Sequence, residues 1–312
     1  MNTASMNTAS INTPSTSKLS LPTLLGNYAG TQGIRSGAIT SDLIDLQIAD
    51  VKVSNRAFPR VVRTREFQVA ELALVTFFQA RAYGRPLVLM PAVIGAGRTQ
   101  HQCLVYNAER GPVTLDKLAG KRIGIRAHSQ TTVAWIRGFL QNDYGVDLDA
   151  IQWVTFEGAH VAEFDDPSTL ERAAEGKVLV DMLFAGELDA AIIGSGMPDD
   201  ARLQPVVPDP YGEAQAWSER TGAIPINHMV AIDADLAASR PEVVREVYRL
   251  LRESKRLADD QRPGGRDLTP FGLDANRKSL DMLLEYSFQQ RLIPRRMSVE
   301  ELFDDTTRIL GA

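Results

Sequence analysis

Short apolar runs alternate with helical patterns along most of the chain. The apolar runs predict β-strands over residues 43–53, 86–94, 103–107, 122–126, 151–156, 190–194 and 228–233. Apolar residues at helical spacing predict helices over residues 71–83, 132–142, 170–186 and 241–259. This alternation predicts an α/β fold, in which ligands usually bind beyond the carboxyl ends of the strands.

Two stretches of the chain, 66–95 and 186–207, resemble each other. Each has a short apolar strand, then a turn or helix, then another strand, which indicates two lobes of similar plan with a binding cleft between them. Residues 108–114 read as the first crossover between the lobes, and residues 218–227 read as the return. The prediction is therefore an inserted second lobe, with these boundaries: a disordered tail over 1–18, lobe one over 19–107 plus 225–312, and lobe two over 108–224.

Composition narrows the classes of function. The chain has 312 residues and a formal net charge of -5, without the basic stripe of a nucleic-acid-binding protein. Its one cysteine, Cys103, excludes an internal disulfide, and its four histidines show no zinc-binding spacing. No metal site and no organic cofactor are assigned, and the need for a divalent metal is left open. The first eighteen residues have neither the basic region nor the apolar stretch of an export signal, and no apolar run of the chain approaches the length of a membrane span, so we expect a cytoplasmic protein without a membrane partner.

One junction between a strand and a helix carries an unusual group of polar residues. His128, Ser129, Gln130, Thr131 and Thr132 follow the strand 122–126 and open the next helix. One interpretation is that a threonine hydroxyl caps the helix. The other is that free N–H groups, hydroxyls and the helix dipole form a seat for a carboxylate or phosphate.

Six motifs of the chain resemble the 4,5-dihydroxyphthalate decarboxylase family, an enzymatic branch of the type II periplasmic-binding-protein superfamily. The similarity runs from about residue 19 to residue 257 and rests on GNYAGTQGIRSG (26–37), REFQVAEL (65–72), GRTQHQCLVYN (97–107), LAGKRIGI (118–125), WIRGFLQNDYGV (135–146) and IPINHMVAID (224–233). The resemblance implies a two-lobed α/β fold and the non-oxidative decarboxylation of a hydroxylated aromatic acid, 4,5-dihydroxyphthalate to protocatechuate or a close analogue. It implies ligand groups at Glu71, Arg98, His101, Thr131, Arg137 and His228.

Loss of CO2 from an aromatic ring requires a proton for the ipso carbon, and histidine changes charge near neutral pH. We therefore expect His101 and His228 to converge at the cleft, where one protonates the ring carbon and the other polarises a ring hydroxyl. Glu71 is the candidate base for a ring hydroxyl or a metal ligand together with the histidines, and its plainer alternative role is a carboxylate at a helix start. We expect arginine side chains and helix-end N–H groups to bind the carboxylates of the acid. The predicted substrate-binding residues are Arg98, Thr131, Arg137, His128, Ser129 and Thr132.

Plainer roles stay open for these residues. His101 and His228 can each be a structural histidine that is hydrogen-bonded to a backbone carbonyl. Arg98 can be an ordinary solvated arginine, which is the usual state of a single cation. Trp135 and Trp153 are expected in the core. At the level of the whole protein, the alternative is a non-catalytic binding protein for a small aromatic or organic acid. The expected partner is in both cases a small-molecule acid, not a nucleic acid, and self-association is left open.

Overall fold

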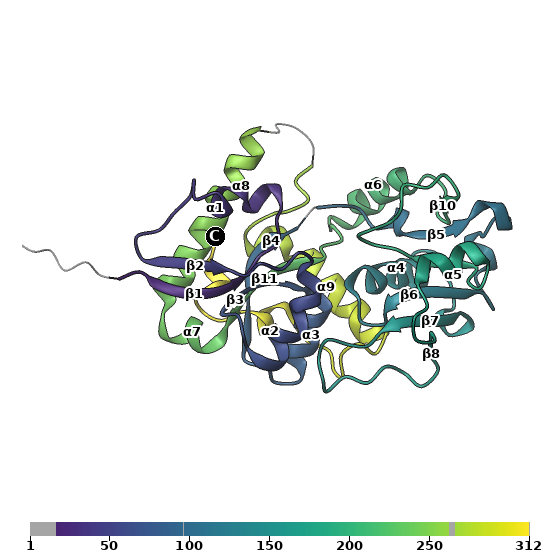
Figure 1. Ribbon diagram of the computed structural model, residues 1–312, viewed down its shortest axis with the longest axis horizontal. Coiled ribbons are helices and arrows are strands. Elements are labelled where there is room, and N and C mark those ends of the chain that lie inside the picture. The colour runs from purple at the N-terminus through teal and green to yellow at the C-terminus, as the bar shows by residue number, and fades with distance from the viewer. Residues whose placement is uncertain (1–16, 96, 262–265, 312) are drawn as a thin grey trace, which may run out of the picture.

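A computed structural model describes residues 17–95, 97–261 and 266–311 of the chain. Apart from Ser17 and Lys18, the tail predicted to be disordered over 1–18 lies outside these residues. Two groups of elements lie side by side, each built around its own β-sheet (Figure 1). The predicted α/β arrangement with two lobes is therefore what the chain adopts.

The first sheet contains five strands within the described residues, in the order β2-β1-β3-β11-β4. β11 runs antiparallel to its two neighbours, and its first residue, His228, pairs with Ala73 of β3 and with Ile94 of β4. Those residues end their strands, so His228 lies at the edge where the carboxyl ends of β3 and β4 meet. The strands are β1 (Leu19–Leu24), β2 (Ile44–Ile48), β3 (Val69–Ala73), β4 (Leu87–Ile94) and β11 (His228–Asp233).

The second sheet contains six strands within the described residues, in the order β10-β5-β9-β6-β7-β8. β6 runs parallel to β7 and β9, whereas β5 runs antiparallel to β9 and β10. The strands are β5 (Leu104–Asn107), β6 (Arg122–Ala127), β7 (Gln152–Glu157), β8 (Glu171–Arg172), β9 (Ala190–Ile192) and β10 (Leu203–Pro205).

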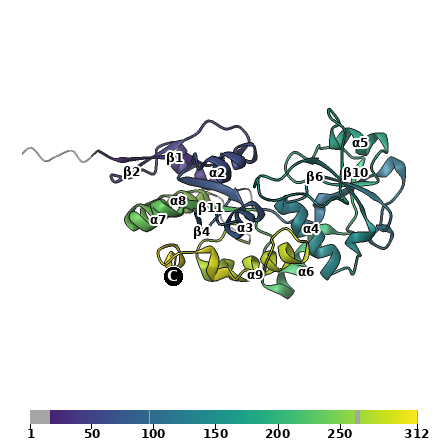
Figure 2. The same cartoon turned by 90° about the horizontal axis from the view of Figure 1, so that it is seen from below.

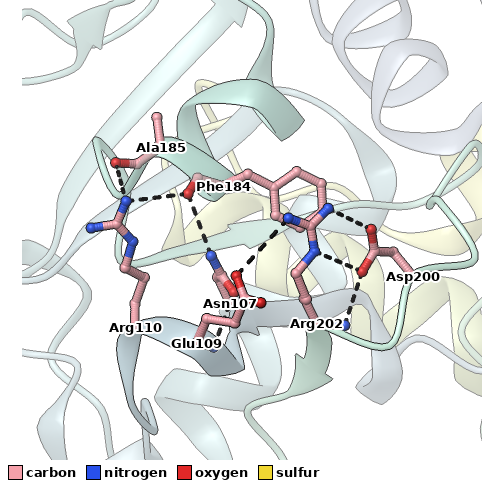
Figure 3. A network of polar contacts seen from close by, with 7 residues as sticks. All are labelled: Asn107, Glu109, Arg110, Phe184, Ala185, Asp200 and Arg202. Carbon is pink, nitrogen blue, oxygen red and sulfur yellow. Dashed lines mark hydrogen bonds and ion pairs between the residues drawn. The ribbon is translucent and has the colours of Figure 1, made fainter.

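The first crossover differs from the prediction. The chain leaves the first sheet at Ile94 and enters the second at Leu104, so the crossover lies before β5 and not over 108–114. The prediction assigned β5 to lobe one, and the structure places it in the second sheet. Polar contacts hold the segment after β5 there: the Asn107 side chain donates to the carbonyl of Phe184 at 3.4 Å, and Arg110 donates to the carbonyl of Ala185 at 2.8 Å (Figure 3).

Helices cover both sheets. Within the described residues they are α1 (Gln32–Arg35), α2 (Phe58–Thr64), α3 (Leu74–Ala82), α4 (Thr131–Asn142), α5 (Leu179–Ala185), α6 (Pro210–Thr221), α7 (Ala234–Ser239), α8 (Pro241–Gln261) and α9 (Leu273–Gln289). α5 is shorter than the helix predicted over 170–186, because residues 171–172 join the sheet as β8 and Gly176 follows with a φ of 80°. Figure 2 shows α9, in yellow, along one side of the molecule beside α4.

α4 is the central helix of the packing between the lobes. Its apolar stripe, which includes Val133 and Ile136, is buried as predicted. A Cβ on Gly138 would lie 2.0 Å from the Tyr286 ring, so glycine here lets α9 approach α4 closely. The indole of Trp135 donates to the carbonyl of Ile226 at 2.8 Å, which ties α4 to the return crossover just before β11. α4 is thereby fixed with its N-terminus next to His228.

Candidate active site

A cavity of about 310 Å³ lies between the two sheets. The first sheet and its loops contribute Phe58, the end of β4 and His228 to its wall. The second contributes the end of β6, the N-terminus of α4 and His160. The predicted cleft between lobes is therefore present, and it lies at the carboxyl ends of β3, β4 and β6. We call it the cleft cavity.

A buried carboxylate stands behind His228 in the wall of the cleft cavity. The Oε1 atom of Glu71 lies 2.6 Å from His228 Nδ1 and accepts a hydrogen bond from the Tyr28 hydroxyl at 2.6 Å. Its Oε2 atom accepts from the Gly26 N–H at 2.7 Å and from the Ser54 hydroxyl at 3.1 Å. Both oxygens are therefore occupied by donors, as an ionised carboxylate requires.

Electrostatics support an ionised Glu71. Burial is the largest influence and raises the pKa of this side chain, which is 0% exposed, but hydrogen bonds and charge from His228, with Tyr28 and Gly26, bring its pKa below the ordinary value. Burial and the Glu71 charge raise the pKa of Tyr28 above its ordinary value, so its hydroxyl keeps its proton. Since a carboxylate only accepts, His228 carries hydrogen on Nδ1, and Nε2 is the nitrogen that can exchange a proton with a ligand.

Glu71 was predicted at a helix start, and this placement is wrong. It lies inside β3, paired with Val230 of β11, two residues before the strand ends. Its side chain points to the same side of the sheet as Ala73, because residues two apart in a strand share a face. The carboxylate therefore stabilises no helix, and its partners are the groups around the cleft cavity.

Two further rings line the cleft cavity beside His228. Phe58 meets His228 edge to face with 5.3 Å between ring centroids, and it meets His160 in the same way at 5.6 Å. His160 Nδ1 lies 2.9 Å from the Thr76 hydroxyl of α3. Burial and the charges of Arg126, Arg63 and His228 lower the pKa of His160 to about 4, so its ring is neutral at pH 7. One wall of the cavity is thus aromatic.

Cations approach the cleft cavity from both sheets. Lys52 and Arg98 come from the first group of elements and the crossover after it, and Arg126 comes from β6. The Arg98 guanidinium donates to the Thr132 hydroxyl at 3.3 Å. The N-termini of α3 and α4 also reach the cavity, and their dipoles favour an anion there.

The two threonines that open α4 do not cap it. The helix has Gln130 as its N-cap residue, without a side-chain cap. The Thr131 hydroxyl instead accepts from the Val75 N–H at 3.1 Å and so serves the first turn of α3. Thr131 and Thr132 both line the cleft cavity, whereas Ser129 is buried in the preceding turn and is not among the described residues of its wall.

His101 lies apart from His228. It follows the crossover in a single 3₁₀ turn, where its ring stacks on Phe139 of α4 at 4.2 Å between centroids. It lines a different cavity, with Trp217 and Arg220 of α6. The predicted convergence of the two histidines is therefore wrong. The turn that follows Gln100 directs the His101 ring toward Phe139 and α6, whereas Arg98 and Gln100 line the cleft cavity.

His128 and Arg137 also lie outside the cleft cavity. The Arg137 guanidinium donates to His128 Nδ1 at 2.7 Å and to the His128 carbonyl at 2.8 Å, and both side chains are buried. They line a separate cavity with Trp153. Arg137 follows Thr131 by more than one helical turn and projects from a different side of α4. Of the predicted carboxylate seat at 128–132, Gln130, Thr131 and Thr132 line the cleft cavity.

Several residues of the cleft cavity were not predicted as site residues: Tyr28, Lys52, Phe58, Arg126, His160 and Asn227. Asn227 stands directly before His228 in the motif IPINHMVAID, and Tyr28 lies in the motif GNYAGTQGIRSG, so the motifs themselves pointed to both residues. Arg126 ends the strand that precedes the predicted seat, where a ligand contact was expected on general grounds. Phe58 and His160 gave no such signal.

Two absences concern the described part of the chain alone. No group of three or more histidine, cysteine or acidic side chains within it is arranged to hold a metal ion. No helix within it has both the length and the apolar character needed to span a membrane.

Comparison with known proteins gives two curated relatives. A 4,5-dihydroxyphthalate decarboxylase of Comamonas testosteroni is 26% identical over 327 aligned positions, which cover 92% of this chain and 97% of the relative. A protein of the same name from Pseudomonas putida is 27% identical over 215 positions, covering 64% of this chain and 82% of the relative. The resemblance read from the motifs is confirmed. No family model matches the chain.

Solved structures of similar shape establish the fold. The alkanesulfonate-binding protein SsuA of Xanthomonas axonopodis pv. citri, bound to MOPS, superposes with a TM-score of 0.61 at 13% identity, over 92% of this chain and 98% of its own. The desulfurization enzyme DSZB superposes with a TM-score of 0.55 at 14% identity, over 93% and 98% of the two chains. The chain has the two-lobed periplasmic-binding-protein-like fold, which hosts both binding proteins and an enzyme.

Proposed function

We propose that the protein is a carboxy-lyase that removes one carboxylate from a hydroxylated aromatic acid, with 4,5-dihydroxyphthalate or a close analogue as substrate. The observation that carries the proposal is the His228–Glu71 pair in the wall of a cavity that three cations also line. A receptor needs cations to hold an acid. It has no need of a histidine backed by a buried carboxylate, which is an arrangement suited to proton transfer.

The wall of the cleft cavity supports this class of substrate. Arg98, Arg126 and Lys52 offer charge for two carboxylates. The side-chain oxygens of Gln130 and Asn227 are buried acceptors without a hydrogen-bond partner among the described residues, and ring hydroxyls are donors that would satisfy them. Phe58 gives the ring an apolar neighbour. A volume of about 310 Å³ suits a single-ring molecule.

The proton step follows from the hydrogen bonds of His228. Its side chain is 25% exposed, and Nδ1 is held by Glu71, which leaves Nε2 to face the ligand. As the bond between the ring and the carboxylate breaks, its electron pair stays on the ipso carbon, and Nε2 delivers the proton that this carbon takes up. CO2 leaves, and the negative charge of Glu71 stabilises the protonated imidazole before this transfer. Glu71 touches His228 and not the substrate, so it is a positioning residue.

The test is an assay of CO2 release with purified protein and a panel of hydroxylated phthalates and benzoates, each with and without chelator and added divalent metal. We expect CO2 and the monocarboxylic acid in equal amounts from at least one dihydroxyphthalate. Binding of these acids without CO2 release under every metal condition would favour the non-catalytic binding protein instead. A cytoplasmic location stays a prediction.

A further inference from the structure

Behind α4 lies a second cavity, of about 660 Å³, that shares no lining residue with the cleft cavity. We call it the rear cavity. Its wall includes His128, Arg137 and Trp153, and the last turn of α9 closes one side through Gln289 and Gln290. The rear cavity is thus enclosed by elements from both halves of the sequence.

Arg137 places a buried guanidinium in the wall of the rear cavity, and no carboxylate in the described part of the chain forms an ion pair with it. The side chain is 3% exposed, and no acidic group of the described residues lies within ion-pair distance of it. Asp166 attracts it electrostatically, but the ion pair of Asp166, at 2.8 Å, is with Arg172. Burial lowers the pKa of Arg137 to about 9, against the pull of Asp166, which leaves the guanidinium charged at pH 7. A buried charge of this kind is costly without a partner.

The neighbouring histidine adds a donor and no negative charge. A guanidinium can only donate, so His128 Nδ1 accepts from Arg137 and the proton of the neutral ring is on Nε2. Burial and the Arg137 charge lower the pKa of His128 to about 2, which keeps the ring neutral. The His128 Nε2 and Arg137 Nε atoms are both buried, and neither has a hydrogen-bond partner among the described residues. Two buried donors and one positive charge therefore lack an acceptor.

We propose that the rear cavity binds a small monocarboxylate, whose oxygens accept from the Arg137–His128 pair. Trp153 supports a planar ligand, because the Arg137 guanidinium already lies over its ring, 5.7 Å from the centroid. The exposed part of the wall carries Asp147, Asp149 and Arg291, whereas Glu171 is already paired with Arg122 at 2.6 Å. The net charge of this rim is therefore negative and disfavours a dianion, whereas a single negative charge is balanced by the one buried guanidinium. This site is independent of the proposed decarboxylation.

The test uses benzoate as the probe and the indole N–H of Trp153 as the reporter, in protein labelled with ¹⁵N at its tryptophans. Trp153→Phe identifies the signal among the three tryptophans of the chain. We expect benzoate to shift this signal saturably in the unchanged protein and equally in Arg98→Gln, which alters only the cleft cavity. Arg137→Gln should weaken the binding by about 10- to 100-fold, the usual effect of losing hydrogen bonds to a charged group.

The indole signals of the other two tryptophans report whether Arg137→Gln is folded. A second variant keeps the proposal testable if it is not. Gln141 is an exposed residue of α4 at the mouth of the rear cavity. The larger side chain of Gln141→Trp should block this mouth and abolish the benzoate response of Trp153. A Trp153 signal that does not respond to benzoate, or that responds unchanged in a folded Arg137→Gln or Gln141→Trp protein, would show that the Arg137–His128 pair is structural only. Loss of the response in Arg98→Gln would assign the binding to the cleft cavity.

Discussion

Two histidines of this protein stand beside a buried charged residue, and the sign of that charge separates their chemistry. At the cleft cavity, Glu71 accepts from Nδ1 of His228, which directs Nε2 toward a ligand and stabilises the imidazole when it is protonated. At the rear cavity, Arg137 donates to Nδ1 of His128, and burial together with the Arg137 charge lowers the pKa of that ring to about 2. In the two proposals, the histidine of the cleft cavity transfers a proton, and the histidine of the rear cavity donates a hydrogen bond to the ligand.

The comparison shows that the role of a histidine in a cavity wall is inferred from the charged residue to which its ring is hydrogen-bonded. The sequence analysis predicted a catalytic role for His228 and a substrate-binding role for His128, although each stands where a strand meets a loop. The carboxylate beside His228 and the guanidinium beside His128 are the basis for proposing a catalytic role for the first and a binding role for the second. The substitutions below test that distinction.

The largest expected effect belongs to His228→Asn. Removing the group that supplies the ipso proton should lower kcat for decarboxylation by about 10²–10⁴, the usual range for general acid–base residues. The matched control is His101→Asn, the same change at a histidine that faces a different cavity. We expect the control to retain most of its turnover. Equal losses in both variants would show that the change disturbs folding and not the site.

Glu71→Gln should have the next largest effect. The amide keeps the size of the side chain but removes the negative charge that balances the protonated His228, so kcat should fall by about 10- to 100-fold. Substrate affinity should change little, because Glu71 lies behind the histidine and is fully buried. Steady-state kinetics separate the two parameters, and an increase in KM with unchanged kcat would contradict the positioning role.

Arg98→Gln tests the acid-binding side of the cleft cavity. The guanidinium donates to Thr132 at the N-terminus of α4, where the substrate carboxylate is expected. Its loss should raise KM by about 10-fold with a smaller change in kcat, because the contact is made in the ground state as well as in the transition state. Arg110→Gln is a suitable control, since Arg110 is exposed and bonds to carbonyls at α5.

The smallest effect concerns stability in acid. Burial and the Arg220 charge lower the pKa of His101 from 6.5 to about 4. The unfolded chain therefore takes up this proton before the folded protein does, and the free energy of unfolding should fall as the pH drops from about 6.5 to 4. His101→Phe keeps the stacking on Phe139 and removes the titrating group, so its unfolding should depend less on pH in that window. Urea unfolding of both proteins at pH 7 and pH 4.5 measures this. An equal loss of unfolding free energy between the two pH values in both proteins would refute the assignment.

The sequence predicted most of the buried strands, because apolar runs of this length indicate burial directly, but it missed β1 and β8 and made β2 too long. β4, β5, β6, β7 and β11 all lie where the pattern placed them, to within one or two residues. The cleft was predicted from the resemblance between residues 66–95 and 186–207, and its position at strand ends followed from a general rule of such folds. His228, Glu71 and Arg98 were predicted as site residues, and the structure brings the first two together and places Arg98 in the same wall.

What failed depended on long-range packing. The crossover was placed after β5 because residues 108–114 contain Gly111 and Pro112, a turn signal that marks an exposed loop as readily as a passage between lobes. His101 was misplaced because one 3₁₀ turn decides which side of α4 receives its ring, and that turn has no signature in the sequence. Helical spacing alone could not say which side of α4 faces the cleft cavity, so Arg137 was assigned to the wrong one.

The most direct test of the central claim is a double-mutant cycle on Glu71 and His228, with CO2 release from 4,5-dihydroxyphthalate as the measured rate. If Glu71 acts through His228, the double variant Glu71→Gln/His228→Asn should be about as slow as His228→Asn alone, because the carboxylate has no proton-transfer group left to assist. A double variant whose loss equals the product of the two single losses would show that the residues act independently, and would contradict the account of this pair.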